Sequence, residues 1–108
     1  MKTEKLVEVF AEAWRQLNVD IIAPYLSDDF VYSSMWVLAT LEGRDAYINY
    51  LQKKFEAIKV SGNIPLVATG YNEGGIPSVI LKQGSEPPSF LIVKSRNGLI
   101  TEAYMMGF

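Results

Sequence analysis

The sequence of 108 residues contains no cysteine and no histidine. The absence of cysteine excludes disulfides, thiolate nucleophiles and metal sites built on cysteine, and it is compatible with a reducing compartment. The absence of histidine removes the side chain that most often serves as a general base and as a ligand for transition metals. Many covalent and metal-dependent mechanisms are therefore excluded from the start.

Long apolar runs and a strong charge of one sign are missing as well. The longest uncharged stretches, residues 30–41 and 60–72, hold 12 and 13 residues, whereas a membrane-spanning helix needs about 20. Glutamates interrupt the N-terminal region where a signal peptide carries an apolar run. Ten basic against twelve acidic residues leave a net charge of −2, without the basic footprint of a nucleic-acid-binding protein. We expect a soluble, cytoplasmic protein that binds neither nucleic acid nor membrane.

The sequence also lacks the short motifs for phosphate, dinucleotide and calcium binding. Asp28 and Asp29 are adjacent, so their carboxylates point apart, and no third ligand follows at a suitable spacing. We interpret this pair as part of a turn. The glycine-rich segment 70–75 lacks the lysine and the following helix of a phosphate-binding loop and is interpreted as a hairpin turn. No metal and no cofactor are predicted.

The residues that are present describe one folded domain over residues 1–108, with 49% apolar and 12% aromatic side chains. Apolar residues at helical spacing in the first half, among them Phe10 and Trp14, predict helices. Thr3 is the expected N-cap of the first helix. The elements expected in this half are a helix from residue 3 to Asn18, a short helix over 19–26, a strand over 30–37 and a helix over 44–59. The apolar spacing of the last helix predicts a buried stripe of Tyr47 or Ile48, Leu51, Phe55 and Ile58, and we expect Lys53, Lys54 and Glu56 to face water.

The second half predicts strands separated by clusters of glycine, asparagine and proline. The expected strands are 64–71, 76–83, 89–96 and 99–106, and the Asn97-Gly98 pair between the last two indicates a hairpin. The fold class is α+β, in the order α-α-β-α-β-β-β-β. Three N-terminal helices pack in the concave face of a strongly curved, mainly antiparallel sheet of about five strands, which leaves a cone with a pocket at its open end.

Several segments resemble the nuclear transport factor 2-like superfamily, which includes the SnoaL-like polyketide cyclases and the ketosteroid isomerases. They are Trp14, Asn18-Val19-Asp20, Leu26 to Tyr32, Leu41 to Arg44 and Asn97 to Glu102. The resemblance covers about residues 3–107. It implies the cone-shaped fold and a homodimer formed through the exposed face of the sheet.

The resemblance does not carry over the isomerase chemistry. A ketosteroid isomerase uses an aspartate base and an oxyanion hole made of a tyrosine and a protonated aspartate. At the matching positions this sequence has Ser34, Phe10 and Ser89. A serine cannot replace a carboxylate base, whose contribution is typically about 10²–10⁴-fold. No catalytic residue is predicted.

A ligand site is predicted from two sets of residues. Strand alternation places Tyr32, Ser34 and Trp36 on one face, opposite the aromatic stripe of the first helix. On the last strand, Glu102 and Tyr104 share a face with Ile100 and Met106. That face either enters the pocket or forms the outer side of the sheet. The predicted ligand-binding set is Phe10, Trp14, Tyr32, Ser34, Trp36, Glu102 and Tyr104.

Three classes of function remain open. The first is a non-catalytic domain that binds a small apolar or aromatic molecule in an aromatic-lined pocket. The second is an isomerase, dehydratase or hydrolase that acts on a small apolar substrate through Glu102, Tyr104 or Tyr32. The third is a homodimeric interaction module with a filled cone. Strands 76–81 and 89–93 are apolar on both faces, which favours a partner subunit on the outer face, with Val79 or Ile92 outward.

Overall fold

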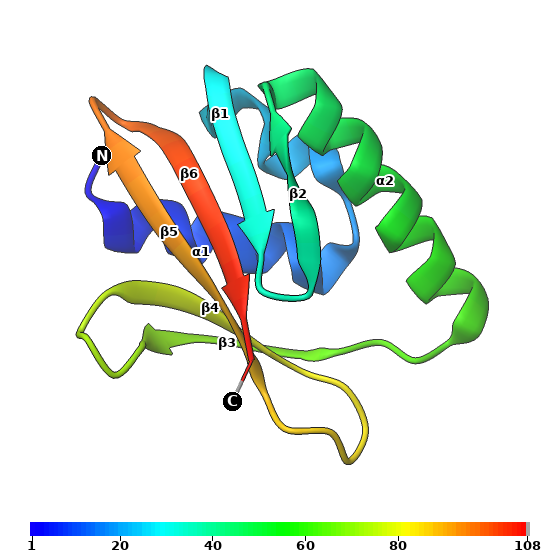
Figure 1. Cartoon of the computed structure of the whole chain (residues 1–108). Helices are drawn as coiled ribbons and strands as arrows, with labels where there is room; N and C mark the ends of the chain where they lie inside the picture. The colour runs from blue at the N-terminus through cyan, green and yellow to red at the C-terminus, as the bar shows by residue number, and fades with distance from the viewer. Residues whose placement is uncertain (108) are drawn as a thin grey trace.

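The computed structural model describes residues 1–107, except for the side chains of residues 37–39. The chain begins with helix α1 and two 3₁₀ turns and continues with β1, β2, helix α2 and four further strands (Figure 1). The bounds are α1 Thr3–Gln16, η1 Val19–Ile21, η2 Ala23–Tyr25, β1 Leu26–Ser34, β2 Val37–Glu42, α2 Arg44–Ser61, β3 Leu66–Tyr71, β4 Pro77–Lys82, β5 Ser89–Arg96 and β6 Leu99–Met106.

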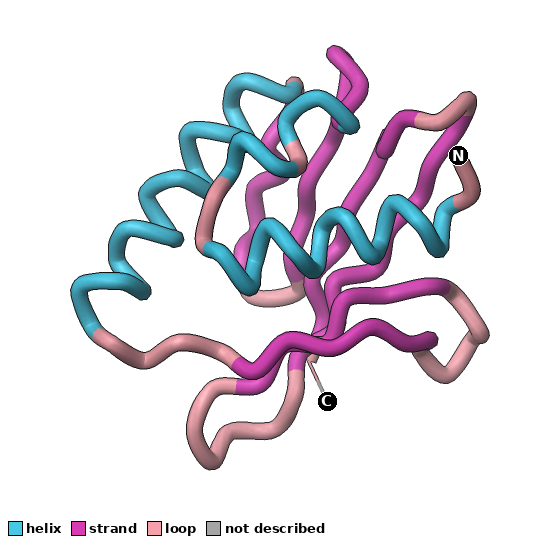
Figure 2. The backbone as a smooth tube through the Cα atoms, turned by 180° about the vertical axis from the view of Figure 1, so that it is seen from behind, coloured by secondary structure: helices cyan, strands magenta, loops and turns pink. Residues whose placement is uncertain are grey.

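The six strands form one mixed sheet in the order β2-β1-β6-β5-β4-β3. All neighbouring pairs are antiparallel except β1 and β6, which run parallel. The sheet is strongly curved, and both helices lie on its concave face (Figures 1 and 2). Helix α1 contacts β3, β4 and β5, whereas α2 contacts β1 and β2. The predicted α+β class is confirmed, with six strands in place of five.

The additional strand is β2, which occupies a segment that the sequence predicted to be a loop. The strand expected over 30–37 ends at Ser34, and β2 begins three residues later and pairs with it. At its other end β1 begins at Leu26, so that Asp28 and Asp29 lie within the strand and not in a turn. The pairing of β1 with β6 is irregular between Leu26 and Val31, and this irregularity hides the strand alternation there.

The short helix expected over 19–26 is replaced by the two 3₁₀ turns η1 and η2. Asn18 caps the first, since its side-chain oxygen accepts the Asp20 N–H at 3.0 Å. Pro24 has no N–H and cannot continue an α-helical ladder, so a second, separate turn forms around it. The N-cap of α1 is Lys2, so Thr3 is the first helical residue and not the cap.

The core lies between the helices and the concave face of the sheet. Phe10 of α1 and Phe30 of β1 are fully buried beside Tyr47 of α2. The expected stripe of α2 is confirmed, with Tyr47, Leu51, Phe55 and Ile58 all buried. None of the helices in the described residues is long and apolar enough to cross a membrane.

A bulge in β6 decides which of its side chains face outward. Lys94 of β5 pairs with Glu102, but the next residue, Ser95, pairs with Ile100, so that Thr101 is an extra residue. Ile100 is therefore turned into the core, while Glu102 and Tyr104 face the outer side. Val79 in β4 is fully buried in the core, which corrects its expected outward position.

Candidate functional site

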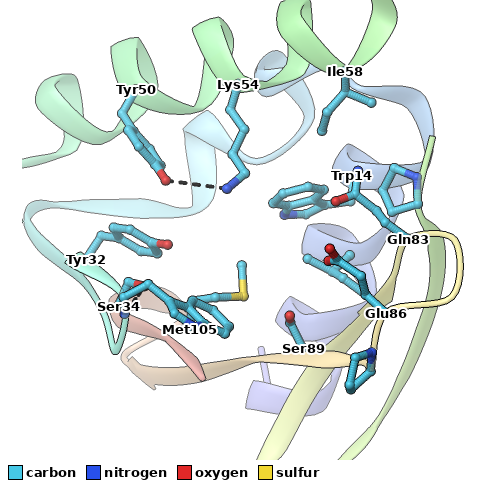
Figure 3. A pocket seen from close by; sticks show the side chains of 14 residues that line it. Trp14, Tyr32, Ser34, Tyr50, Lys54, Ile58, Gln83, Glu86, Ser89 and Met105 are labelled. Carbon is cyan, nitrogen blue, oxygen red and sulfur yellow. Dashed lines mark hydrogen bonds between the residues drawn. The ribbon is translucent and has the colours of Figure 1, made fainter. Parts of the chain in front are cut away.

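A cavity of about 210 Å³ opens between helix α2 and the inner face of the sheet (Figure 3). Helix α1 forms one wall of the cavity and α2 forms a second. The ends of the strands and the loop between β4 and β5 form the rest. The lining consists of Trp14, Tyr32, Ser34, Trp36, Tyr50, Lys54, Ile58, Pro65, Leu81, Gln83, Glu86, Pro87, Ser89 and Met105.

Four residues of the predicted set are brought together in this cavity: Trp14, Tyr32, Ser34 and Trp36. Phe10 instead lies in the core, where its ring meets Tyr47 edge to face at 6.3 Å between centroids. Because β1 ends at Ser34, Trp36 reaches the cavity from the turn after the strand, and its side chain is 59% exposed. The Ser34 hydroxyl accepts the Trp36 N–H at 3.1 Å and fixes this turn.

Glu102 and Tyr104 do not reach the cavity. They line a shallow hollow on the opposite side of the sheet, together with Ile92 and Lys94. Glu102 is exposed there and lies 3.7 Å from the Lys94 ammonium. The carboxylate and phenol of the last strand are therefore separated by the sheet from Tyr32 and cannot act on a molecule bound beside it.

Two residues of α2, Tyr50 and Lys54, line the cavity although sequence reasoning did not select them. Lys54 was expected to face water, but it is half-buried and its side chain points into the cavity. Both belong to the series Tyr47, Tyr50, Lys54 and Ile58, whose spacings of three and four residues follow one side of the helix. This spacing could have indicated that Tyr50 and Lys54 lie on the same side of the helix as Tyr47. The charge of Lys54 instead led to its assignment to the solvent-exposed side.

Three tyrosines form a connected cluster beside the cavity. The ring centroids of Tyr32 and Tyr47 are 4.9 Å apart, and those of Tyr32 and Tyr50 are 5.5 Å apart. Burial raises the pKa of the Tyr32 phenol far above its ordinary value, the neighbouring Tyr50 raises it further, and the Ser34 hydroxyl lowers it. Burial likewise raises the pKa of Tyr47. Both phenols therefore stay protonated at neutral pH.

The indole nitrogen of Trp14 is a buried donor that finds no acceptor among the described residues. The residue is 3% exposed, and its ring packs edge to face on Phe55 at 4.9 Å between centroids. Nε1 has no hydrogen-bond partner within the part of the chain that is described. The indole lies on the cavity wall (Figure 3). An unpaired buried N–H costs about 1–3 kcal/mol, so this atom marks a place where an acceptor is missing.

The cavity offers little for acid–base or metal chemistry. Ser34 and Ser89, which the resemblance matches to the aspartates of the isomerases, both line it. The carboxylate in the lining is that of Glu86, on the exposed loop between β4 and β5. Across residues 1–107, no group of three acidic side chains comes together as a metal site would require. The polar groups of the lining are hydroxyls, the Lys54 ammonium, the Gln83 amide, the Glu86 carboxylate and two indole N–H groups, set among aromatic and aliphatic side chains.

Solved structures identify the fold. No family model matches the sequence, and no curated protein matches it either. An NTF2-like protein of unknown function from Cytophaga hutchinsonii superposes with a TM-score of 0.69 at 16% identity, over 100% of this chain and 91% of the other. A Catenulispora acidiphila protein with a ketosteroid isomerase-like fold, solved in complex with trimethylamine, gives 0.66 at 16% identity, over 96% and 85%.

A de novo designed protein with a curved β-sheet is equally similar, with a TM-score of 0.70 and 19% identity over 100% of this chain and 88% of the designed one. At such identities the likeness establishes the fold and leaves the function to the residues of the site. The aromatic cluster and the fold together fit a small-molecule-binding domain. The helices on one face of a curved six-stranded sheet, and the structures that share them, show that this chain has the nuclear transport factor 2-like fold.

Proposed function

We propose that this protein binds a small planar molecule in the cavity between α2 and the sheet and catalyses no reaction on it. The observation that carries the proposal is Trp14, whose indole lines the cavity and whose buried N–H has no acceptor in the described structure. A ligand oxygen at this place would supply that acceptor. The aromatic walls would hold the flat part of the same molecule.

The volume of the cavity limits the size of the ligand. An engineered apolar cavity of about 150 Å³ binds benzene, and pockets for drug-sized ligands measure about 300–1,000 Å³. A cavity of about 210 Å³ therefore suits one ring with a small polar substituent. The complex of the Catenulispora protein with trimethylamine supports this scale, because it shows a protein of this fold holding a molecule of few atoms.

The absence of catalysis is inferred from the groups that surround the ligand. Ser34 stands where a carboxylate base would act. Burial keeps the Tyr32 phenol protonated, so that it donates or accepts hydrogen bonds without serving as a base at neutral pH. Glu86 is exposed at the rim, where water surrounds its carboxylate. These groups can orient a ligand through hydrogen bonds, but none of them is a general base in contact with it.

Titration with benzamide, one ring with one carbonyl, tests the proposal by isothermal calorimetry. We expect saturable binding. Trp14→Phe should weaken the binding about tenfold, because phenylalanine still supplies an aromatic ring but has no N–H to donate. Trp36→Phe is the matched control, because it replaces the other tryptophan of the lining and leaves the Trp14 N–H in place. Equal affinity in Trp14→Phe, or no binding to the parent protein, would refute the proposal.

We also propose that two copies of the chain associate through the outer face of the sheet. Both helices lie on the inner face. The outer face carries Ile92 and Tyr104 next to the Lys94–Glu102 ion pair. A twofold axis would bring these apolar side chains together and set the positive and negative ends of the two ion pairs against each other. The support is the position of Ile92 and the partly exposed Tyr104 on a face of the sheet that neither helix covers.

A further inference from the structure

We propose that the ligand is an aromatic carboxylate, with its ring between the aromatic walls and its carboxylate on the Lys54 ammonium and the Trp14 N–H. This inference rests on the proposed function and adds the charge of the ligand to it. It is carried by the placement of Lys54, by the groups of the lining that can only donate hydrogen bonds and by the volume of the cavity.

Lys54 is a half-buried cation that has no counter-ion among the described residues. Its ammonium lies 3.5 Å from the Tyr50 hydroxyl and 5.7 Å from the centre of that ring. It forms no ion pair with any side chain in the described residues, in contrast to Arg15, Arg44 and Lys94. Figure 3 shows the ammonium directed into the cavity. Partial removal of a charge from water is unfavourable unless an opposite charge or polar group compensates it.

The hydroxyls of Tyr32, Tyr50, Ser34 and Ser89 and the Gln83 amide each donate and accept hydrogen bonds. In contrast, Lys54 and the indole N–H groups of Trp14 and Trp36 can only donate. A carboxylate accepts about four hydrogen bonds and matches this set. A ligand with an ammonium group would have to lie beside Lys54, where like charges repel.

The carboxylate already present, Glu86, does not serve as the counter-ion. It belongs to the exposed loop between β4 and β5 and forms no ion pair with Lys54 in the described structure. Its charge is surrounded by water, which weakens its effect on an anion deeper in the cavity. The volume of about 210 Å³ is about one and a half times that of a cavity that holds benzene, which leaves room for a ring and a carboxylate.

The test compares three probes of nearly equal shape on the full chain at neutral pH: benzoate, benzamide and benzylamine. Calorimetry gives the affinities, and quenching of tryptophan fluorescence checks them, since both tryptophans of the sequence line the cavity. We expect benzoate to bind about tenfold more tightly than benzamide, and benzylamine to bind least. In Lys54→Met, benzoate should lose this advantage while benzamide binds as before, which also shows that the variant is folded.

Lys53→Met is the matched control. It removes the same charge from the neighbouring, exposed position of the same helix and should leave the preference for benzoate intact. If benzamide binds as tightly as benzoate, or if Lys53→Met abolishes the preference as fully as Lys54→Met, the inference is wrong and the proposed function stands. If none of the three probes binds, both the inference and the proposed function are wrong.

Discussion

Tyr47 is the residue through which the interior responds most clearly to pH. It is 1% exposed, and burial together with Tyr32 and Tyr50 raises its pKa. Above the ordinary tyrosine pKa of about 10, the unfolded chain loses this proton and the folded chain keeps it. The unfolded state then binds fewer protons, so the free energy of unfolding falls as the pH rises. Below that pH both states are protonated and this phenol contributes no slope.

We therefore expect the free energy of unfolding, measured by urea denaturation, to fall as the pH rises from about 9 to about 11. Tyr47→Phe should remove part of that fall. The part removed should be about 1.4 kcal/mol at pH 11, one pH unit above the unfolded pKa. The same series at about pH 8 is the control, since the phenol is protonated there in both states. A fall of equal size in the parent and in Tyr47→Phe would contradict the description of this site.

Some residues of the candidate site could be predicted from the sequence, and others could not. Trp14, Tyr32 and Ser34 were predicted because aromatic periodicity and strand alternation report which side faces the core. Lys54 was assigned to water because periodicity treats every charge as a surface group. A lysine with its apolar stem on the helix stripe and its ammonium in a cavity does not differ in sequence from an exposed one. The Trp14 N–H finds no acceptor among the described residues, and this depends on the three-dimensional arrangement of the chain, which the sequence does not show.

At the scale of elements, the turn between β5 and β6 is the most strictly determined feature. Asn97 and Gly98 have φ values of 55° and 79°, the two successive positive values of a type I′ hairpin. We expect Gly98→Ala to destabilise the protein by about 1 kcal/mol, because a side chain disfavours this backbone conformation. A Cβ there would meet its nearest neighbour only at 3.6 Å, so crowding adds nothing.

Gly74→Ala, in the turn between β3 and β4, is the control for this prediction. Gly74 has no positive φ, and a Cβ added there would lie 3.5 Å from its nearest neighbour, an ordinary contact distance. The same chemical change should there alter stability by less than about 0.5 kcal/mol. Chemical denaturation measures both variants. Equal effects at the two glycines would show that the hairpin conformation does not control stability.

The sequence predicted elements well where a local signal exists and poorly where pairing decides. The Asn97-Gly98 turn, the stripe of α2 and the last two strands follow from local chemistry and are confirmed. The bulge at Thr101 arises from the pairing of β6 with β5, and the irregular start of β1 arises from its pairing with β6. The sequence of one strand alone does not determine such a pairing. For that reason the sequence left the face of Glu102 and Tyr104 open, and the structure places both outside.

At the scale of the whole molecule, the uncovered face of the sheet determines the expected assembly. Ile92→Lys would place a charge in the proposed contact between two copies, where it has no partner, and we expect it to weaken the dimer about a hundredfold or more. Tyr104→Lys, at a position that is 38% exposed, should have the same effect with less disturbance of the monomer. Sedimentation velocity over a range of concentrations measures the association.

Ile64→Lys is the control for the dimer prediction, because Ile64 is 56% exposed and lies before β3, outside the strands of the sheet. It should leave the dimer unchanged. A parent protein that remains monomeric at every concentration, or a dimer that survives both Ile92→Lys and Tyr104→Lys, would show that the outer face is not the contact.

The central claim is that a ligand supplies the acceptor missing at Trp14, and the indole resonances in a ¹H–¹⁵N spectrum test it most directly. The sequence has two tryptophans, so the spectrum holds two indole signals, which Trp14→Phe assigns. On saturation with benzoate, we expect the Trp14 indole proton to move downfield as it enters a hydrogen bond, with a smaller change at the exposed Trp36. A Trp14 signal that stays in place at saturating benzoate and benzamide would contradict the account.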